Sequence, residues 1–600
     1  MPLNLIFIAP GNYTIDDNGI PGDNTSVIRD GTGAVIFTFA HPADSLGFTV
    51  STPGVHLTVN FTDSLGAANF TVGDLTSAGT SPDSITIGNV RTTGLVTLVS
   101  NGAITELGGD AGADIIAGQL ILSAATGVGS GANAIETQTS FIEAETDTGG
   151  INIRNLGPVQ IGGLSDQVSG LNVGTSGDIN LWAAGSIFLS DETGLETIHG
   201  GSSSGNVTLT AAGLTADIIA NVNQDSIAAP GGNVVLTAGR DIAFGTAGVD
   251  FDNDVRARGS ITIDAGRDFV VDGFADIASD GFGAATGGNL VVNAGRNIEV
   301  RNLTGSDGSI GAEGTAGADV ILTTGVGGAL ILDAPVPAAV FSSSGDVIVN
   351  ADRALIAGTS GISANSGQIF LRPAMVGREI DLGSATDAAF ALELSDAELD
   401  RLFTPTLVIG DDNSGQITVS SALSPANAAD MVLRSGDNIF IQAAITTTGS
   451  LELRAGENVV LSAAPTFTVG GALSIFVDTL GNDGGIGGVV DLSTATITAA
   501  SILVNGAGDN DTLTGANNLD QVFHGNGGND TITSSGEGQY FGDAGNDLIL
   551  AGPSDGITPE ILDGGIGIDT LDTSLFNGNY VINLVTGATN FDYESFVNFE

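Results

Sequence analysis

The chain has 600 residues, 69 of them acidic and 15 basic, all arginine, and its formal net charge is −54. A surface of this charge repels nucleic acids and anionic membranes, which excludes nucleic-acid binding and favours cations or neutral partners. There is no cysteine, which excludes disulfides and thiolate zinc sites, and no apolar stretch is long enough to span a bilayer.

Residues 1–85 are rich in Thr, Val and Phe and contain frequent Gly-Asp turn signals. We expect strands that begin or cap a solenoid, because the open end of a solenoid exposes unpaired strand edges that must be covered. The first residues, MPLNLIFIAPGNYTI, lack a basic segment and a small-x-small cleavage site. A classical secretory signal is therefore not predicted.

Residues 86–500 repeat a short pattern, as in GNVVLTAGRDIAF (232–244), GSITIDAGRDFVV (259–271) and GNLVVNAGRNIEV (288–300). Within each copy, apolar and polar residues alternate with the period of a β-strand. A unit of about 27 residues cannot bury its own apolar face, but stacked copies can. We therefore expect an all-β chain with a parallel β-helix solenoid, taken as right-handed. The alternative is an array of β-sandwiches, whose repeats run nearer to about ninety residues.

The repeat places three arginines at equivalent positions. Arg240, Arg267 and Arg296 each follow an Ala-Gly corner and lie one repeat apart, next to Asp241, Asp268 and Asn297. If the repeats stack in register, the aspartates neutralise the row on the surface. The alternative is a row that binds an acidic glycan. Trp182, in the alternating run LWAAG, is predicted to be a core or stacking residue.

One segment is predicted to be helical. Ser395 and Glu398 have the spacing of a capping box and precede Leu399, Arg401 and Leu402. We expect a short helix over residues 395–403 that interrupts the solenoid as a plug or lateral insert. A partner-binding helix is the alternative.

Residues 501–600 contain units of nine residues that begin with glycine and carry aspartate at the sixth position. They are GAGDNDTLT (506–514), GANNLDQVF (515–523), GNGGNDTIT (525–533), GDAGNDLIL (542–550) and GGIGIDTLD (564–572). Glycine lets the backbone turn its carbonyls inward, and the aspartate adds a carboxylate. Ca²⁺ prefers such a mixed set of oxygen ligands. The alternative is a linker rich in Gly, Asn and Asp.

These units resemble the G-G-x-G-x-D-x-U-x calcium-binding repeat of RTX proteins, in which each unit forms half a coil of a parallel β-roll. The resemblance implies that every second unit lies on the same edge, so that Asp511, Asp530 and Asp547 form one ladder with one Ca²⁺ between each adjacent pair. The opposite ladder is poorer, because Asp520 faces a unit that carries Gln539. The predicted calcium ligands are Asp511, Asp530, Asp547, Asp520, Asp569, Asp509, Asn529, Asn546, Gly528 and Gly545.

The phrase V-x-L-x-A-G-R-D-I resembles the β-helical repeats of filamentous haemagglutinin-like bacterial surface proteins. Together, the two resemblances imply a secreted, calcium-binding bacterial adhesin, or a matrix or S-layer-like component. Its expected partners are calcium ions, a cell-surface glycan or protein receptor, and further copies of itself. The RTX resemblance also implies type I secretion through an uncleaved C-terminal signal, and we expect Glu600 to be a truncation point that precedes this signal.

A catalytic site is not predicted. The four histidines, His41, His56, His199 and His524, are scattered, and there is no lysine to neutralise a uronate substrate. The alternative function is a polysaccharide lyase or epimerase, because parallel β-helices host such enzymes and some epimerases carry RTX modules. This alternative would place the active site on the solenoid.

Overall fold

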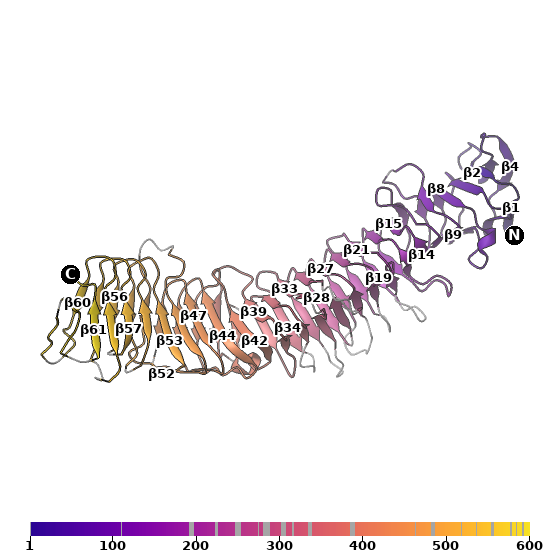
Figure 1. The fold of residues 1–600 in the computed structure, drawn as a ribbon. Coiled ribbons are helices and arrows are strands. Elements are labelled where there is room, and N and C mark those ends of the chain that lie inside the picture. The colour runs from indigo at the N-terminus through magenta and orange to yellow at the C-terminus, as the bar shows by residue number, and fades with distance from the viewer. Residues whose placement is uncertain are drawn as a thin grey trace. The chain divides into compact units, whose positions relative to one another are not determined.

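A computed structural model of the chain is almost entirely β-structure. It describes residues 2–600 except 110, 191–196, 222–225, 246–253, 274, 280–281, 283–287, 302–307, 315–316, 334–338, 385–389, 463, 482–485, 518, 536, 554–556, 577–578, 584 and 591–592. The chain forms two units, one of Met1–Ile321 with Leu332–Ser344 and one of Leu322–Ile331 with Gly345–Glu600. In each unit, long stacks of parallel strands repeat along the chain (Figure 1). The predicted all-β, solenoid-like architecture is confirmed.

The first unit begins with a mixture of strand directions. Strand β1 (Leu3–Phe7) pairs in parallel with β5 (Ser45–Val50), while β3 (Thr25–Arg29) pairs antiparallel with β2 (Gly11–Asp17) and with β4 (Val35–Ala40). From β6 (Val55–Asn60), which pairs in parallel with β8 (Ser84–Arg91), the stack passes residue 85 without interruption.

The repeats of the first unit stack in strict register. Its central strands are β18 (Ile179–Ala183), β21 (Val207–Ala211), β24 (Val234–Ala238), β27 (Ile261–Ala265) and β30 (Leu290–Ala294). Each pairs with the next in parallel. In β24, Val234, Leu236 and Ala238 are buried while Val235 and Thr237 are half-buried, so the alternation in sequence becomes an inner and an outer face. We call one repeat of the chain through the stacks a coil.

The second unit continues this arrangement. Its central stack contains β39 (Gln368–Arg372), β42 (Leu402–Ile409), β44 (Ala428–Ser435), β47 (Leu451–Ala455), β50 (Ala472–Phe476) and β53 (Ser501–Asn505). The capping box of Ser395 and Glu398 is formed, but helix α1 spans only Asp396–Leu399. The expected helix over 395–403 is therefore too long, because Leu402 already begins β42 and its side chain is buried.

The nonapeptide strands stack in alternate sets. One set is β54 (Thr512–Thr514), β56 (Thr531–Thr533), β58 (Leu548–Leu550) and β60 (Thr570–Asp572). The other is β55 (Val522–His524), β57 (Gly538–Phe541), β59 (Glu560–Asp563) and β61 (Glu594–Val597). The first set joins β51 (Val489–Asp491) and the second joins β53, so the strand stacks cross residue 500 without interruption.

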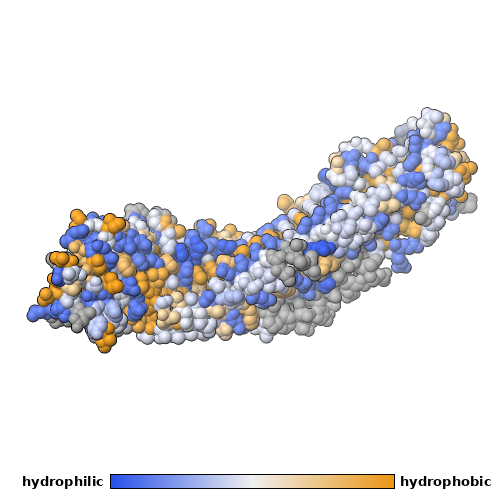
Figure 2. Space-filling model, in the orientation of Figure 1, coloured by the Kyte–Doolittle hydropathy of each residue, from blue (hydrophilic) through white to orange (hydrophobic). Residues whose placement is uncertain are grey.

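The outward-facing positions of the strands carry many polar residues. On the face drawn in Figure 2, hydrophilic residues are mixed with residues of intermediate hydropathy and with apolar patches, which are most evident near the C-terminal end. Outward-facing Thr, Asn and Asp side chains of the strands account for this pattern. Within the described part of the chain, no helix has the length and apolar character needed to cross a membrane.

Candidate metal centre

Four aspartates form a buried ladder along one edge of the nonapeptide coils. Asp511, Asp530, Asp547 and Asp569 each immediately precede a strand of the β54–β56–β58–β60 set, and each is 1% exposed. The backbone N–H of Asp511 donates to Oδ1 of Asp530 at 2.7 Å. The same bond links Asp530 to Asp547 and Asp547 to Asp569, both at 2.8 Å. The strand register thus brings Asp511, Asp530 and Asp547 together as the sequence predicts, and adds Asp569.

The second carboxylate oxygens of this ladder are unpaired. Among the described residues, no hydrogen-bond donor reaches Oδ2 of Asp530, Asp547 or Asp569, although each of these atoms is buried. Asp511 differs, because its oxygens accept from the backbone N–H groups of Gly488 at 2.6 Å and Ala507 at 2.7 Å. A buried carboxylate oxygen without a partner is strongly unfavourable unless a cation or a proton compensates it.

The pKa values of the ladder also indicate that its carboxylates need a compensating proton or cation. Burial raises the pKa of Asp530 to about 7 and the pKa values of Asp511 and Asp547 to about 6, with neighbouring aspartates adding to the shift. No arginine or lysine occurs after Arg454, whereas residues 455–600 contain 19 acidic residues. This part of the chain therefore supplies no arginine or lysine to the ladder.

Glycines bring backbone carbonyls up to these carboxylates. A Cβ added to Gly525 would collide with Oδ2 of Asp530 and lie 2.7 Å from the carbonyl oxygen of Gly542. At Gly506 the corresponding atoms are Oδ2 of Asp511 and the carbonyl oxygen of Gly525. A carboxylate oxygen and a carbonyl oxygen of the next coil thus converge in successive coils. Hard oxygens of these two kinds fit Ca²⁺.

The predicted carbonyl ligands Gly528 and Gly545 lie at the turn. The carbonyl of Asp509 lies against Gly528, and that of Gly528 lies against Gly545. A Cβ on Gly545 would also lie 3.1 Å from Oδ1 of Asp547. The predicted ligands do not include the first glycine of each unit, whose carbonyl meets the same space as an Oδ2 atom of the ladder, although glycine recurs at Gly525, Gly542 and Gly564.

Asn529 and Asn546 belong to a separate, exposed ladder. The N–H of Asn529 donates to Oδ1 of Asn510 at 2.6 Å, and the N–H of Asn546 donates to Oδ1 of Asn529 at 2.7 Å. The N–H of Ile568 continues the series on Asn546 at 2.8 Å. These side-chain oxygens already hold the turns of adjacent coils together.

The predicted register of Asp520 is wrong. Asp520 is exposed, and Gln521 takes the buried position that corresponds to Asp511, because Phe523 rather than Val522 points into the core. Val522 is the residue opposite Gln539, so Asp520 does not face Gln539. The Gln521 amide donates to the carbonyl of Ala516 at 2.8 Å. The opposite edge of this coil therefore presents an amide where the ladder has a carboxylate.

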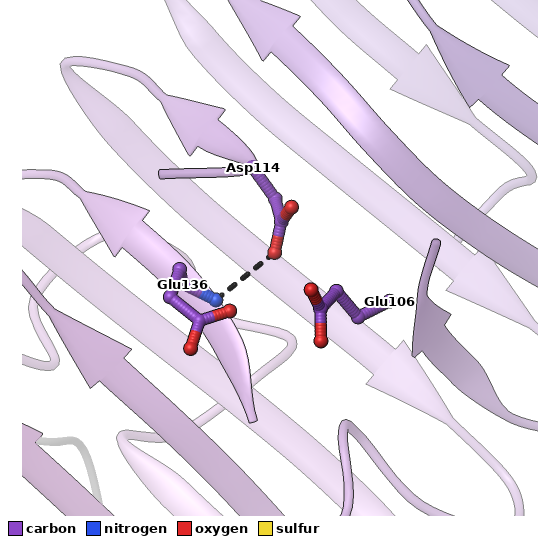
Figure 3. Close-up of side chains that lie close together, drawn as sticks. All are labelled: Glu106, Asp114 and Glu136. Atoms are coloured by element: carbon purple, nitrogen blue, oxygen red, sulfur yellow. Dashed lines mark hydrogen bonds between the residues drawn. The ribbon is translucent and has the colours of Figure 1, made fainter. Parts of the chain in front are cut away.

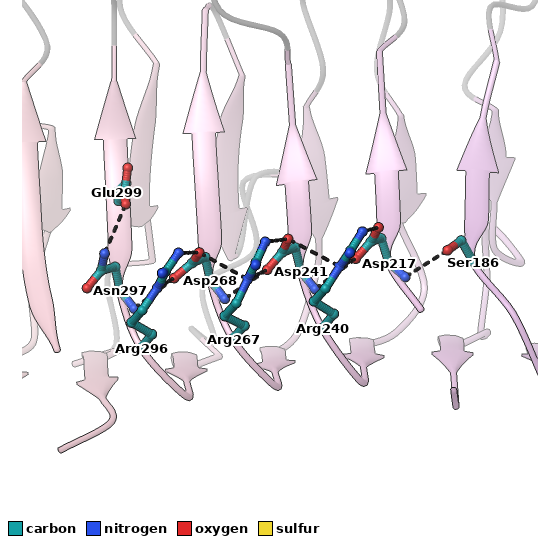
Figure 4. A network of polar contacts seen from close by, with 9 residues as sticks. All are labelled: Ser186, Asp217, Arg240, Asp241, Arg267, Asp268, Arg296, Asn297 and Glu299. Carbon is teal, nitrogen blue, oxygen red and sulfur yellow. Dashed lines mark hydrogen bonds and ion pairs between the residues drawn. The ribbon is translucent and has the colours of Figure 1, made fainter. Parts of the chain in front are cut away.

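The predicted arginine row is formed, and aspartates neutralise it (Figure 4). Each arginine pairs with the aspartate of the preceding coil, and Nε of Arg240, Arg267 and Arg296 donates at 2.7, 2.8 and 2.7 Å respectively. The acceptors are Oδ1 of Asp217, Asp241 and Asp268, whose Oδ2 atoms accept a second bond from Nη2. Such bidentate pairs leave little charge for an acidic ligand.

An acidic cluster not predicted from the sequence lies in the first unit. Glu106 ends β10 (Ile104–Glu106), Asp114 precedes β11 (Ile115–Ile116), and Glu136 lies in β13 (Ile135–Gln138). One carboxylate oxygen from each lies within 4.8 Å of the others (Figure 3). The N–H of Glu136 donates to Oδ2 of Asp114 at 3.1 Å. No sequence motif relates the three, since only the stacking of coils brings them together.

Comparison of the chain with protein-family models, curated proteins and solved structures finds no match. The chemistry of the site therefore stands on its own residues. That chemistry is a stack of buried carboxylates with glycine carbonyls beside them, in the last 146 positions of the chain, which contain no arginine or lysine.

Proposed function

We propose that the coils from Gly506 to Asp572 bind Ca²⁺ and fold with it, as a β-roll of the RTX type. The observation that carries this proposal is the row of buried, unpaired Oδ2 atoms on Asp530, Asp547 and Asp569. Three stacked, buried carboxylates repel one another, and a divalent cation between them converts this repulsion into attraction.

The ions would be held by the carboxylates of this ladder and by the carbonyls of Gly525, Gly542 and Gly564. When bound, Ca²⁺ supplies the positive charge that this part of the chain lacks. Because the ligands come together only when the coils stack, the free energy of binding adds to the free energy of folding. Asp530 lies between two neighbours of the ladder, so it takes part in two sites.

We assign the whole chain to a secreted bacterial surface protein, an adhesin or a matrix or S-layer-like component. At low intracellular Ca²⁺ the nonapeptide coils would stay unfolded, which suits export, and they would fold in the extracellular medium. The stacked strands of the remaining chain, as a parallel β-helix, would display outward-facing side chains to a receptor or to further copies. The net charge of −54 supports a role that depends on cations.

A calcium titration of the metal-free full chain tests this proposal. Circular dichroism should show a cooperative gain of β-signal, and calorimetry should count at least two ions per chain. Mg²⁺ at the same concentration should have a much smaller effect, because it requires a rigid octahedral shell. A flat response to Ca²⁺ would contradict the proposal.

A further inference from the structure

A groove on the outer face of the first unit contains the only tryptophan of the chain. We call it the Trp182 groove and define it by six lining residues: Asn152, Arg154, Asn180, Trp182, Thr208 and Thr210. Its volume is about 440 Å³. The residues come from β15 (Ile151–Asn155), β18 and β21, which are successive strands of one stack.

The strand register places side chains of different size on the two sides of the indole. Arg154, Trp182 and Thr210 occupy equivalent positions on the three strands. The guanidinium carbon of Arg154 lies 4.3 Å from the centre of the Trp182 ring, so it covers the face toward β15. The opposite face looks toward Thr210, whose side chain is much smaller. The less covered face of the indole is therefore the one toward Thr210, and the ring borders the groove.

Arg154 carries a charge that the protein does not neutralise. It is exposed, and it forms no ion pair or hydrogen bond with any described residue. Its neighbour in register, Glu136, lies in the acidic cluster with Glu106 and Asp114 instead. By contrast, Arg240, Arg267 and Arg296 are each held by an aspartate. In a chain with 69 acidic residues, an arginine left unpaired beside a groove is suited to an anionic ligand.

The other four of the six defining residues have uncharged side chains that can form hydrogen bonds. The side chain of Asn180 donates to Oδ1 of Asn152 at 2.9 Å, which orients both amides, and Thr208 and Thr210 add hydroxyls. Amides, hydroxyls, a guanidinium and one aromatic face are the groups that recognise a sugar. A densely acidic polymer would be repelled by the net charge of −54, whereas isolated carboxylates would not.

We propose that the Trp182 groove binds a glycan in which a carboxylate-bearing sugar adjoins a neutral one. The neutral ring stacks on the side of the Trp182 indole that lies toward Thr210, and the carboxylate of the adjoining sugar pairs with Arg154. The proposal rests on the proposed function, because it names the class of ligand that the surface protein binds. The site does not depend on the calcium ladder, since all six residues belong to the first unit.

Calorimetric titration of the full chain with a hyaluronan hexasaccharide, in which glucuronate alternates with a neutral sugar, tests this proposal. The carboxyl-reduced hexasaccharide serves as the matched probe. Trp182→Ala should weaken binding of both probes by about tenfold or more. Arg154→Gln should weaken only the acidic probe, by about tenfold, and so remove the preference between the two. Thr210→Phe, which fills the space beside the indole, should block both.

Phe370→Ala is the control, because Phe370 pairs with Arg372 in the second unit with 5.8 Å between the guanidinium carbon and the ring centre. It should leave binding unchanged, and circular dichroism should show every variant folded. Absence of binding, equal binding of the two probes, or unchanged binding by all three groove variants would overturn the proposal. Titrations in Ca²⁺ and in EGTA should agree, so that failure of the calcium proposal is seen separately.

Discussion

The aspartates of the arginine row and those of the nonapeptide ladder stack in the same way but differ in what neutralises them. In both, backbone N–H groups of neighbouring coils satisfy Oδ1. In the first unit, Oδ2 of Asp217, Asp241 and Asp268 accepts a bond from an arginine. In the second, Oδ2 of Asp530, Asp547 and Asp569 has no described donor.

The pKa values follow this difference. Burial opposes ionisation of Asp217 and Asp268, but the hydrogen bonds and charges of Arg240 and Arg296 outweigh it and lower both pKa values. At Asp530 burial dominates and raises the pKa to about 7. One stacking geometry thus produces a ladder whose carboxylates are neutralised by arginines and another whose buried carboxylates have no described arginine beside them.

The largest expected effect comes from Asp530→Asn. In Ca²⁺, this variant should lose at least about tenfold in calcium affinity, because it removes a charge shared by two sites. Without metal, it should stabilise the same coils, since a buried charge is gone. Isothermal titration and thermal unfolding in EGTA measure the two effects. Asp520→Asn, at an exposed position, is the control. An unchanged calcium response of Asp530→Asn would contradict the proposed ladder.

Gly525→Ala should disturb the same site by adding a methyl group to it, without changing its charge. Its Cβ would occupy the position where Oδ2 of Asp530 and the carbonyl of Gly542 converge, so both the calcium affinity and the stability of the folded coils should fall. Gly508→Ala is the matched control, because a Cβ there meets no atom within 4 Å. Equal calcium affinities of the two variants would show that the ions bind elsewhere.

A pH series without metal should separate the two ladders. Since burial raises the pKa of Asp530 to about 7 from an ordinary 3.8, the folded coils retain protons that the unfolded chain has lost. The stability of the metal-free nonapeptide coils should therefore fall as the pH rises from about 4 to 7, and Ca²⁺ should restore it above that range. Hydrogen exchange of peptides from residues 506–572, in EGTA, measures this. Slower exchange at pH 7.5 than at pH 5, after correction for intrinsic rates, would contradict the prediction.

Asp268→Asn should lower the free energy of unfolding, whereas Asp530→Asn without metal should raise it. The change at Asp268 should be the smaller of the two. Asp268 is 6% exposed and accepts from Nε of Arg296 at 2.7 Å and from the N–H of Asn297 at 3.2 Å. Loss of its charge should destabilise the first unit by about 2 kcal/mol. Urea unfolding should give the same loss of unfolding free energy in Ca²⁺ and in EGTA. A calcium-dependent value would show that the two ladders are not independent.

Much of this comparison could be predicted from the sequence. The spacing of the nonapeptides gives the ladder of Asp511, Asp530 and Asp547, and the Ala-Gly-Arg repeat gives the arginine row. The partner of Arg240 could not be predicted in the same way. Asp217 of the preceding coil, and not Asp241, makes the closest pair with it, because the side chain reaches along the stack.

The errors arose where the repeat is irregular. The thirteen residues between Leu550 and Gly564 concealed that Asp569 continues the ladder. In the unit that begins at Gly515, a count of nine placed Asp520 inward, but the strand is shifted by one residue and buries Gln521 and Phe523. A shift of one residue moves every side chain of a strand to its other face.

The sequence by itself determined the repeat, the alternation of inner and outer residues and the separation of arginine-rich from arginine-free coils. Only the tertiary structure decided which side chains of different coils meet. The grouping of Glu106, Asp114 and Glu136, the stacking of Arg154 on Trp182 and the unpaired oxygens of the aspartate ladder all depend on it. The physical reason is that adjacent strands lie about 4.8 Å apart, so the register between coils sets the contacts. Loops of variable length between the strands change which residues of the sequence occupy equivalent positions.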